Sequence, residues 1–169
     1  MINRYTNVID QDNLQSVLDL VSVRSSRPWH FQTSLSNSSN TFFISYLNQT
    51  EIDLIIPLLK SSLDRYSPNG EFVLERAYIN CHPSFSSGEW HVDGNDGLTL
   101  LYYPPTIFDF GNKGGTDFEL HGEEKYVPNS LIIFPAWWNH KAVEHTVPGA
   151  YRFSIAVKLK DKYPKNPVI

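Results

Sequence analysis

The stretch Tyr151-Arg-Phe-Ser-Ile-Ala-Val-Lys-Leu159 decides the fold, because two kinds of side chain alternate along it. A period of two is typical of a β-strand, whose successive side chains point to opposite faces. One face carries the large side chains Tyr151, Phe153, Ile155, Val157 and Leu159, and the other carries Arg152, Ser154 and Ala156. We expect the large face to pack on helices and the small face to border a cavity. A guanidinium there binds a carboxylate or phosphate bidentately, whereas an Arg on a solvated face is the alternative explanation.

Short segments separated by Gly, Pro and Asn fill the chain from Gly70 onward, with no helical period between them. They predict strands at 72–80, 90–93, 98–103, 116–120, 125–127, 130–134, 141–147 and 151–159. Short strands without crossover helices favour an antiparallel barrel or a double-sheet jelly roll. We therefore expect a jelly-roll core over residues 71–160.

Residues 1–70 predict mainly helical support for that core. An apolar stripe over 10–23 predicts an amphipathic helix, and a second helix is expected over 50–66, kinked or restarted at Pro57. Residues 41–47 predict one strand, and the Ser- and Asn-rich stretch 25–40 predicts loops, with a short edge strand as an alternative within it. The expected fold class is mainly β, with N-terminal buttressing helices, in a single domain spanning 1–169.

The composition narrows the function classes. The chain has 169 residues, with 41% hydrophobic, 14% aromatic and 19% charged, which is typical of a packed globular protein rather than a disordered one. The net charge of −4 does not favour nucleic acid as a partner. A single cysteine, Cys81, permits no internal disulfide, and no apolar run reaches the roughly 20 residues of a membrane span. Without a signal-peptide profile at the start, we expect a cytoplasmic protein whose oligomeric state the sequence leaves open.

His91-Val-Asp93 places an imidazole and a carboxylate two residues apart, on the same face of a strand. Such a pair can contribute two ligands to one metal ion, although an isolated H-x-D is a weak signal. A third ligand would make the pattern specific.

His140 and His145 are both candidates for the third ligand. His140 follows the apolar strand 130–134, so the chain can return it to the cavity. Two His and one carboxylate form the facial triad of non-haem Fe(II) oxygenases. His145 competes with His140, because a two-residue loop at Pro148-Gly149 would place it opposite Arg152, whereas a loop of odd length would turn His140 inward. The turn type leaves the loop length open.

Taken together, these segments resemble the 2-oxoglutarate and Fe(II)-dependent dioxygenases, in the branch similar to prolyl 4-hydroxylases. The likeness covers residues 76–159, in the segments Arg76-Ala-Tyr-Ile-Asn80, His91-Val-Asp93, Leu98-Thr-Leu-Leu-Tyr-Tyr103, Gly114-Gly-Thr-Asp-Phe118, Phe134-Pro-Ala-Trp-Trp-Asn-His140 and Arg152-Phe-Ser-Ile155. Two segments depart from the family pattern, namely Tyr103-Pro-Pro105 and Gly114-Gly-Thr-Asp117. Both departures affect the expected choice of substrate more than the expected binding of iron or co-substrate.

The resemblance implies a double-stranded β-helix in which Fe(II) is held by the catalytic residues His91, Asp93 and His140. It favours His140 over His145, because Phe-Pro-x-Trp-x-x-His followed by Arg-x-Ser-Ile matches the family's segment. It also implies that Arg152 binds the far carboxylate of 2-oxoglutarate. The co-substrate site implied in this way consists of Arg152, Tyr103, Ser154 and Thr99.

The implied activity uses O₂ and 2-oxoglutarate, releases succinate and CO₂, and hydroxylates a C–H bond. The substrate would be a peptide, with a prolyl residue as one candidate, or a small molecule. One alternative is a cupin-type metal enzyme without 2-oxoglutarate, in which Arg152 binds the substrate's own anion. Another is a catalytically silent jelly roll that binds a peptide or a sugar. Residues 104–113 are either a mobile lid or a plain loop between strands.

Overall fold

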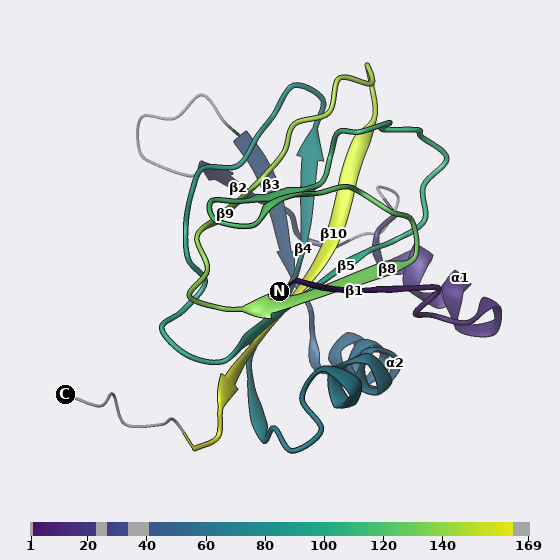
Figure 1. The fold of residues 1–169 in the computed structure, drawn as a ribbon. Coiled ribbons are helices and arrows are strands. Elements are labelled where there is room, and N and C mark those ends of the chain that lie inside the picture. The colour runs from purple at the N-terminus through teal and green to yellow at the C-terminus, as the bar shows by residue number, and fades with distance from the viewer. Residues whose placement is uncertain (1, 23–26, 34–40, 164–169) are drawn as a thin grey trace.

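The computed structural model describes residues 2–22, 27–33 and 41–163, which form two antiparallel sheets and two helices (Figure 1). The strands are β1 (Asn3–Thr6), β2 (His30–Thr33), β3 (Thr41–Tyr46), β4 (Phe72–Pro83), β5 (Leu98–Tyr103), β6 (Thr116–Phe118), β7 (Gly122–Glu124), β8 (Ser130–Pro135), β9 (His140–Ala142) and β10 (Tyr151–Asp161). The major sheet has the order β1-β8-β5-β10-β4-β3-β2, and the minor sheet has the order β7-β6-β9. The predicted jelly roll is confirmed. Predictions for 23–26 and 34–40 lie outside the described residues.

Both helices begin at the caps that their sequences encode. In α1 (Gln11–Leu20) the Asp10 side chain accepts a hydrogen bond from the backbone N–H of Asn13, and α2 (Gln49–Tyr66) begins with a capping box between Asn48 and Glu51. The predicted restart at Pro57 does not occur, because α2 continues through it, and the alternative of a kink stays a prediction. Pro57 is exposed, so the hydrogen bond that its missing N–H cannot make lies on the solvent side of the helix.

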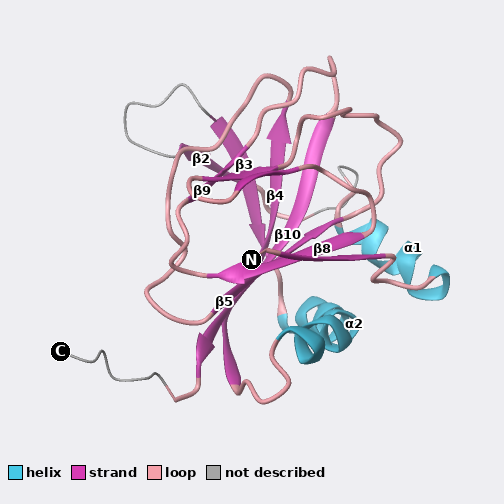
Figure 2. Cartoon of the chain, in the orientation of Figure 1, coloured by secondary structure: helices cyan, strands magenta, loops and turns pink. Residues whose placement is uncertain are grey.

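The helices pack on one face of the major sheet (Figure 2). Val17 of α1 and Ile55 and Leu59 of α2 share a core with the large face of β10. Ile155, Val157 and Leu159 are buried there, which confirms the predicted division of this strand. Neither helix of the described residues combines the length and apolar character of a membrane-spanning segment.

Residues 1–70 contribute strands to the major sheet as well as the two helices. The strand expected at 41–47 is confirmed as β3, which pairs with β4, and the short edge strand considered within 25–40 is β2. Strand β1 was not expected, and it pairs with β8 at the other edge. The prediction missed the role of β1 because its partner lies more than 120 residues away in sequence, where local patterns carry no information about pairing.

Three predicted strands differ from the structure. Residues 90–93 form only an isolated bridge, because the N–H groups of Asp93 and Gly94 both donate to the carbonyl of Ala136 in a tight turn. The strand expected at 125–127 lies earlier in the sequence, as β7. A short turn follows β6, so Gly122 already pairs with Phe118. The strand expected at 141–147 shortens to β9, and the chain then crosses from the minor sheet to the major one.

Candidate metal centre

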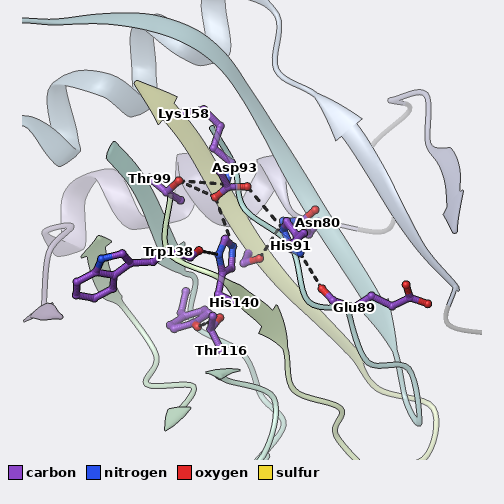
Figure 3. Close-up of polar contacts among 11 residues, drawn as sticks. Asn80, Glu89, His91, Asp93, Thr99, Thr116, Trp138, His140 and Lys158 are labelled. Atoms are coloured by element: carbon purple, nitrogen blue, oxygen red, sulfur yellow. Dashed lines mark hydrogen bonds and ion pairs between the residues drawn. The ribbon is translucent and has the colours of Figure 1, made fainter. Parts of the chain in front are cut away.

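Two histidines and one aspartate converge between the two sheets (Figure 3). His91 and Asp93 lie in the connection from β4 to β5, and His140 begins β9. The N–H of His91 donates to the carbonyl of His140 at 3.0 Å, and the N–H of His140 donates to the carbonyl of His91 at 2.9 Å. This reciprocal pair holds the two imidazoles side by side, with ring centroids 4.4 Å apart.

The distances suit a single ion. One ligand atom from each of His91, Asp93 and His140 lies within 4.8 Å of the others. Asp93 Oδ1 is 3.7 Å from Nε2 of His91, and Asp93 Oδ2 is 3.4 Å from Nε2 of His140. Two imidazoles and a carboxylate form the donor set of a non-haem iron facial triad, so the residues present fit Fe(II).

Backbone carbonyls set the tautomer of both histidines. His91 Nδ1 is 2.8 Å from the carbonyl oxygen of Glu89, and His140 Nδ1 is 2.8 Å from that of Trp138. Because a carbonyl only accepts, each Nδ1 carries the proton and each Nε2 keeps its lone pair for a metal. Burial lowers the pKa of His140 to about 4, against the opposing attraction of Asp93. His140 is therefore neutral at pH 7.

Asp93 is ionised as well. Its burial would raise its pKa, but the Lys158 ammonium, His140 and hydrogen bonds from Lys158 and Thr99 outweigh burial and lower the pKa to about 2. Thr99 Oγ1 donates to Asp93 Oδ2 at 2.6 Å, and Lys158 Nζ donates to the same oxygen. His140 and Asp93 thus have the protonation states that metal binding requires.

A cavity of about 400 Å³ opens beside this centre. Two of the metal-binding residues, His91 and His140, line this cavity. The small face of β10 also lines it, through Arg152, Ser154 and Ala156. The predicted cavity on that face is therefore present, and Arg152 is buried in its wall rather than solvated.

No family model matches the chain, and no curated protein matches it. Solved structures do. A prolyl hydroxylase from Trichoplax adhaerens, solved with a hypoxia inducible factor peptide fragment, is 17% identical with a TM-score of 0.71, over 95% of this chain and 84% of that one. A Pseudomonas putida prolyl-4-hydroxylase is 12% identical with a TM-score of 0.69, over 95% of this chain and 92% of that one.

A 2OG-Fe(II) oxygenase family protein from Burkholderia pseudomallei is 14% identical with a TM-score of 0.68, over 94% of this chain and 84% of that one. The chain has the 2OG-Fe(II) oxygenase fold. The family resemblance found in the sequence therefore agrees with the architecture of the molecule.

Within this oxygenase fold, Arg152 lies at the wall formed by β10 and the loop before β6. Its Nε donates to the carbonyl of Gly114 at 2.5 Å, and its Nη2 donates to the carbonyl of Gly115 at 3.0 Å. A guanidinium has five N–H donors, so these two bonds orient it and leave donors for a carboxylate in the cavity. Ser154 lies next along the same face, with its hydroxyl 3.4 Å from Nδ2 of Asn80.

Tyr103 and Thr99 were both expected at the co-substrate site beside Arg152, but the structure separates them. Tyr103 is beside Arg152, whose guanidinium carbon is 5.4 Å from the ring centroid, but its hydroxyl bonds that of Thr116 at 2.7 Å. Thr99 lines the cavity and turns its hydroxyl to Asp93. The structure therefore brings Tyr103 to Arg152 and brings Thr99 to the metal-binding residues.

His145 is not part of the metal centre. It is buried against the ring of Phe110, and its Nε2 lies 3.3 Å from the carbonyl oxygen of His82. The hairpin argument for His145 does not apply, because β9 and β10 belong to different sheets and Arg152 pairs with His82 of β4.

Sequence reasoning missed two residues of the cavity wall. His82, expected at the surface or in a turn, is buried, lines the cavity and stacks on Phe42 with centroids 4.7 Å apart. Lys158 is buried and touches Asp93. Period-two alternation was the available signal, because Lys158 continues the Arg152, Ser154 and Ala156 face of β10.

Proposed function

We propose that this chain is an Fe(II)- and 2-oxoglutarate-dependent dioxygenase that hydroxylates a C–H bond. The observation that carries the proposal is the meeting of His91, Asp93 and His140 beside a cavity whose wall contains a buried guanidinium. When bound, the iron with 2-oxoglutarate and O₂ would supply the oxidative decarboxylation that yields succinate, CO₂ and the hydroxylated substrate.

The chain's own residues would hold and orient the reactants. His91, Asp93 and His140 would bind the ion. Arg152 would bind the far carboxylate of 2-oxoglutarate, and its two bonds to the loop before β6 fix its direction. Tyr103 would support Arg152 through the ring contact, and Ser154 and Thr99 would border the co-substrate. The walls would exclude water from the reacting groups.

For the substrate we propose a peptide, with a prolyl side chain as the first candidate. The Trichoplax prolyl hydroxylase of the same fold was solved with a peptide fragment, which supports this class. At the cavity of this chain, Trp90 is 43% exposed, so an aromatic surface is available beside the metal centre, although the Lys141 ammonium lies over the ring at 4.6 Å from its centroid. A small-molecule substrate is the second candidate. A cytoplasmic location stays a prediction from the single cysteine.

The test is an anaerobic titration with Fe(II) and 2-oxoglutarate, followed by O₂ and a library of peptides and small molecules, with succinate release as the readout. We expect succinate only when Fe(II), 2-oxoglutarate and a substrate are all present. Asp93→Ala should abolish it, while Asp53→Ala on the exposed side of α2 should not. Metal binding without any effect of 2-oxoglutarate would favour the cupin-type enzyme, and no metal binding would favour the silent binding module.

A further inference from the structure

Lys158 is a buried lysine at the metal centre. It lies on β10, its residue is 4% exposed, and its Nζ donates to Asp93 Oδ2 and approaches Thr99 Oγ1 at 3.4 Å (Figure 3). Its ammonium also lies 5.8 Å from the ring centroid of Tyr78. Lysine is almost never fully buried unless it is paired, and the partner here is a carboxylate of the metal-binding triad.

The hydrogen bonds around Asp93 distinguish its two oxygens. A carboxylate oxygen has about two lone pairs. Oδ2 accepts from Thr99 Oγ1 and from Lys158 Nζ, so both of its lone pairs are taken. Each oxygen lies near one imidazole, Oδ1 at 3.7 Å from Nε2 of His91 and Oδ2 at 3.4 Å from Nε2 of His140, so the number of donors and not the distance separates the two oxygens. Oδ1 is therefore the oxygen that remains for an ion held together with the two imidazoles.

The charges point the same way. Arg152 and Lys158 lie on the same face of β10, but Arg152 bonds backbone carbonyls whereas Lys158 bonds the triad carboxylate. The Lys158 ammonium pairs directly with the Asp93 carboxylate and balances its charge. An ion bound there would keep its full positive charge for an anionic co-substrate.

We propose that Lys158, together with Thr99, is a positioning residue that occupies Oδ2 of Asp93 and so makes this carboxylate a one-oxygen ligand. The inference rests on the proposed metal centre. Without Lys158, Asp93 gains a free lone pair on Oδ2 and binds the ion through both oxygens. That second oxygen takes a coordination position that a co-substrate needs.

The experiment uses the full chain loaded with Co(II) alone, whose visible bands report the number and type of ligands. We expect Lys158→Met to bind one Co(II) per chain, with visible bands shifted relative to wild type, because a second carboxylate oxygen changes the ligand set of the ion. Lys158→Arg keeps a cationic donor, and the adjoining cavity has room for it, so it should restore the wild-type bands. Lys160→Met is the matched control, because Lys160 lies two residues along β10 and pairs with Glu75 at the surface.

Each outcome decides the matter. Wild-type bands in Lys158→Met would overturn the positioning role while leaving the proposed function intact. Failure of the wild-type chain to bind Co(II) would overturn both. Should Lys158→Met not fold, Thr99→Val carries the test, because it frees the other lone pair of Oδ2 at nearly constant volume. Shifted bands in that variant support the assignment, and unchanged bands reject it.

Discussion

His91 and His140 exchange two backbone hydrogen bonds, 3.0 and 2.9 Å long, although 49 residues separate them in sequence. The bridge joins the connection after β4 to the first residue of β9, so it links the two sheets at the metal centre. The backbone hydrogen bonds therefore fix the Cα positions of both histidines. The hydrogen bond from each Nδ1 to a carbonyl fixes the orientation of the ring. The site is preorganised before any ion enters.

His140→Ala should abolish metal retention, because loss of one of three protein ligands removes a large part of the binding free energy. His145→Ala should keep one metal ion per folded chain, because His145 contacts Phe110 and His82 and not the triad. Metal content after gel filtration, together with calorimetric titration, measures both. The opposite pattern would make His145 the ligand.

Arg152→Ala should weaken 2-oxoglutarate binding about ten-fold or more, because a charge-assisted bond contributes roughly 1.5–3 kcal/mol. Iron affinity should hardly change. The variant also leaves the buried carbonyl of Gly114 without the Arg152 donor, whereas the carbonyl of Gly115 keeps the N–H of Val143, so thermal stability should fall. Titration of the iron-loaded protein with 2-oxoglutarate measures the first effect, and unchanged binding would place the carboxylate site elsewhere.

Tyr103→Phe should weaken 2-oxoglutarate binding at most several-fold, because the ring stays beside Arg152 and the only bond lost is the internal one to Thr116, whose about 0.5–1.5 kcal/mol is the upper limit of the effect. Tyr102→Phe is the matched control. The Tyr102 hydroxyl bonds Asn129 Oδ1 at 3.0 Å in the helix-side core, so its loss should lower stability and leave co-substrate binding alone. If the two variants behaved alike in binding, Tyr103 would have no role at the co-substrate site.

The free energy of unfolding of the metal-free protein should fall as the pH drops from 6.5 to 4. In this window the unfolded state protonates His140, whose ordinary pKa is 6.5, while the folded state holds it neutral down to about 4. The folded state thus binds fewer protons, and acid favours unfolding by about 3 kcal/mol from this residue. Above 6.5 and below 4 the contribution is constant.

Urea unfolding at several pH values tests this, with His140→Gln as the comparison. Burial also lowers the pKa values of His82 and His145, which add losses of the same sign to both proteins. The difference between wild type and variant therefore isolates His140. Parallel curves would show that His140 is not held neutral.

Gly115→Ala should destabilise the protein severely. A Cβ at this position would lie 2.0 Å from the backbone oxygen of Glu124, which cannot move without disrupting the β6–β7 hairpin. Because the carbonyl of Gly115 accepts from Arg152, any chain that still folds should also bind 2-oxoglutarate more weakly. Gly111→Ala is the control, because an added Cβ at this position would have no atom within 4 Å. The positive φ of Gly111 adds a small strain to this variant.

Much of the fold could be predicted because it depends on local patterns. Alternation predicted both faces of β10, and β5 was predicted with its observed bounds, Leu98–Tyr103. The edge position of β1 could not be predicted, because strand order depends on distant pairing rather than on the pattern within a strand.

The grouping of His91, Asp93 and His140 followed from spacing and resemblance, and the structure places them together. Lys158 could have been found by extending the alternation of Arg152, Ser154 and Ala156 along β10, whereas His82 was missed because the face of β4 that lines the cavity is set by its pairing with distant strands. The roles of Arg152, Tyr103, Ser154 and Thr99 toward a co-substrate stay predictions.

Alternate side chains of β10 belong to the helix-side core and to the cavity wall. Ile155 and Val157 are buried on the helix side, while the residues between them face the cavity. Inserting a single residue in the middle of this strand, between Ile155 and Ala156, would exchange the two faces on one side of the insertion and turn either Lys158 or Arg152 toward the apolar core. Insertions or deletions of an odd number of residues here should therefore damage folding and activity together, whereas substitutions at alternate positions separate the two.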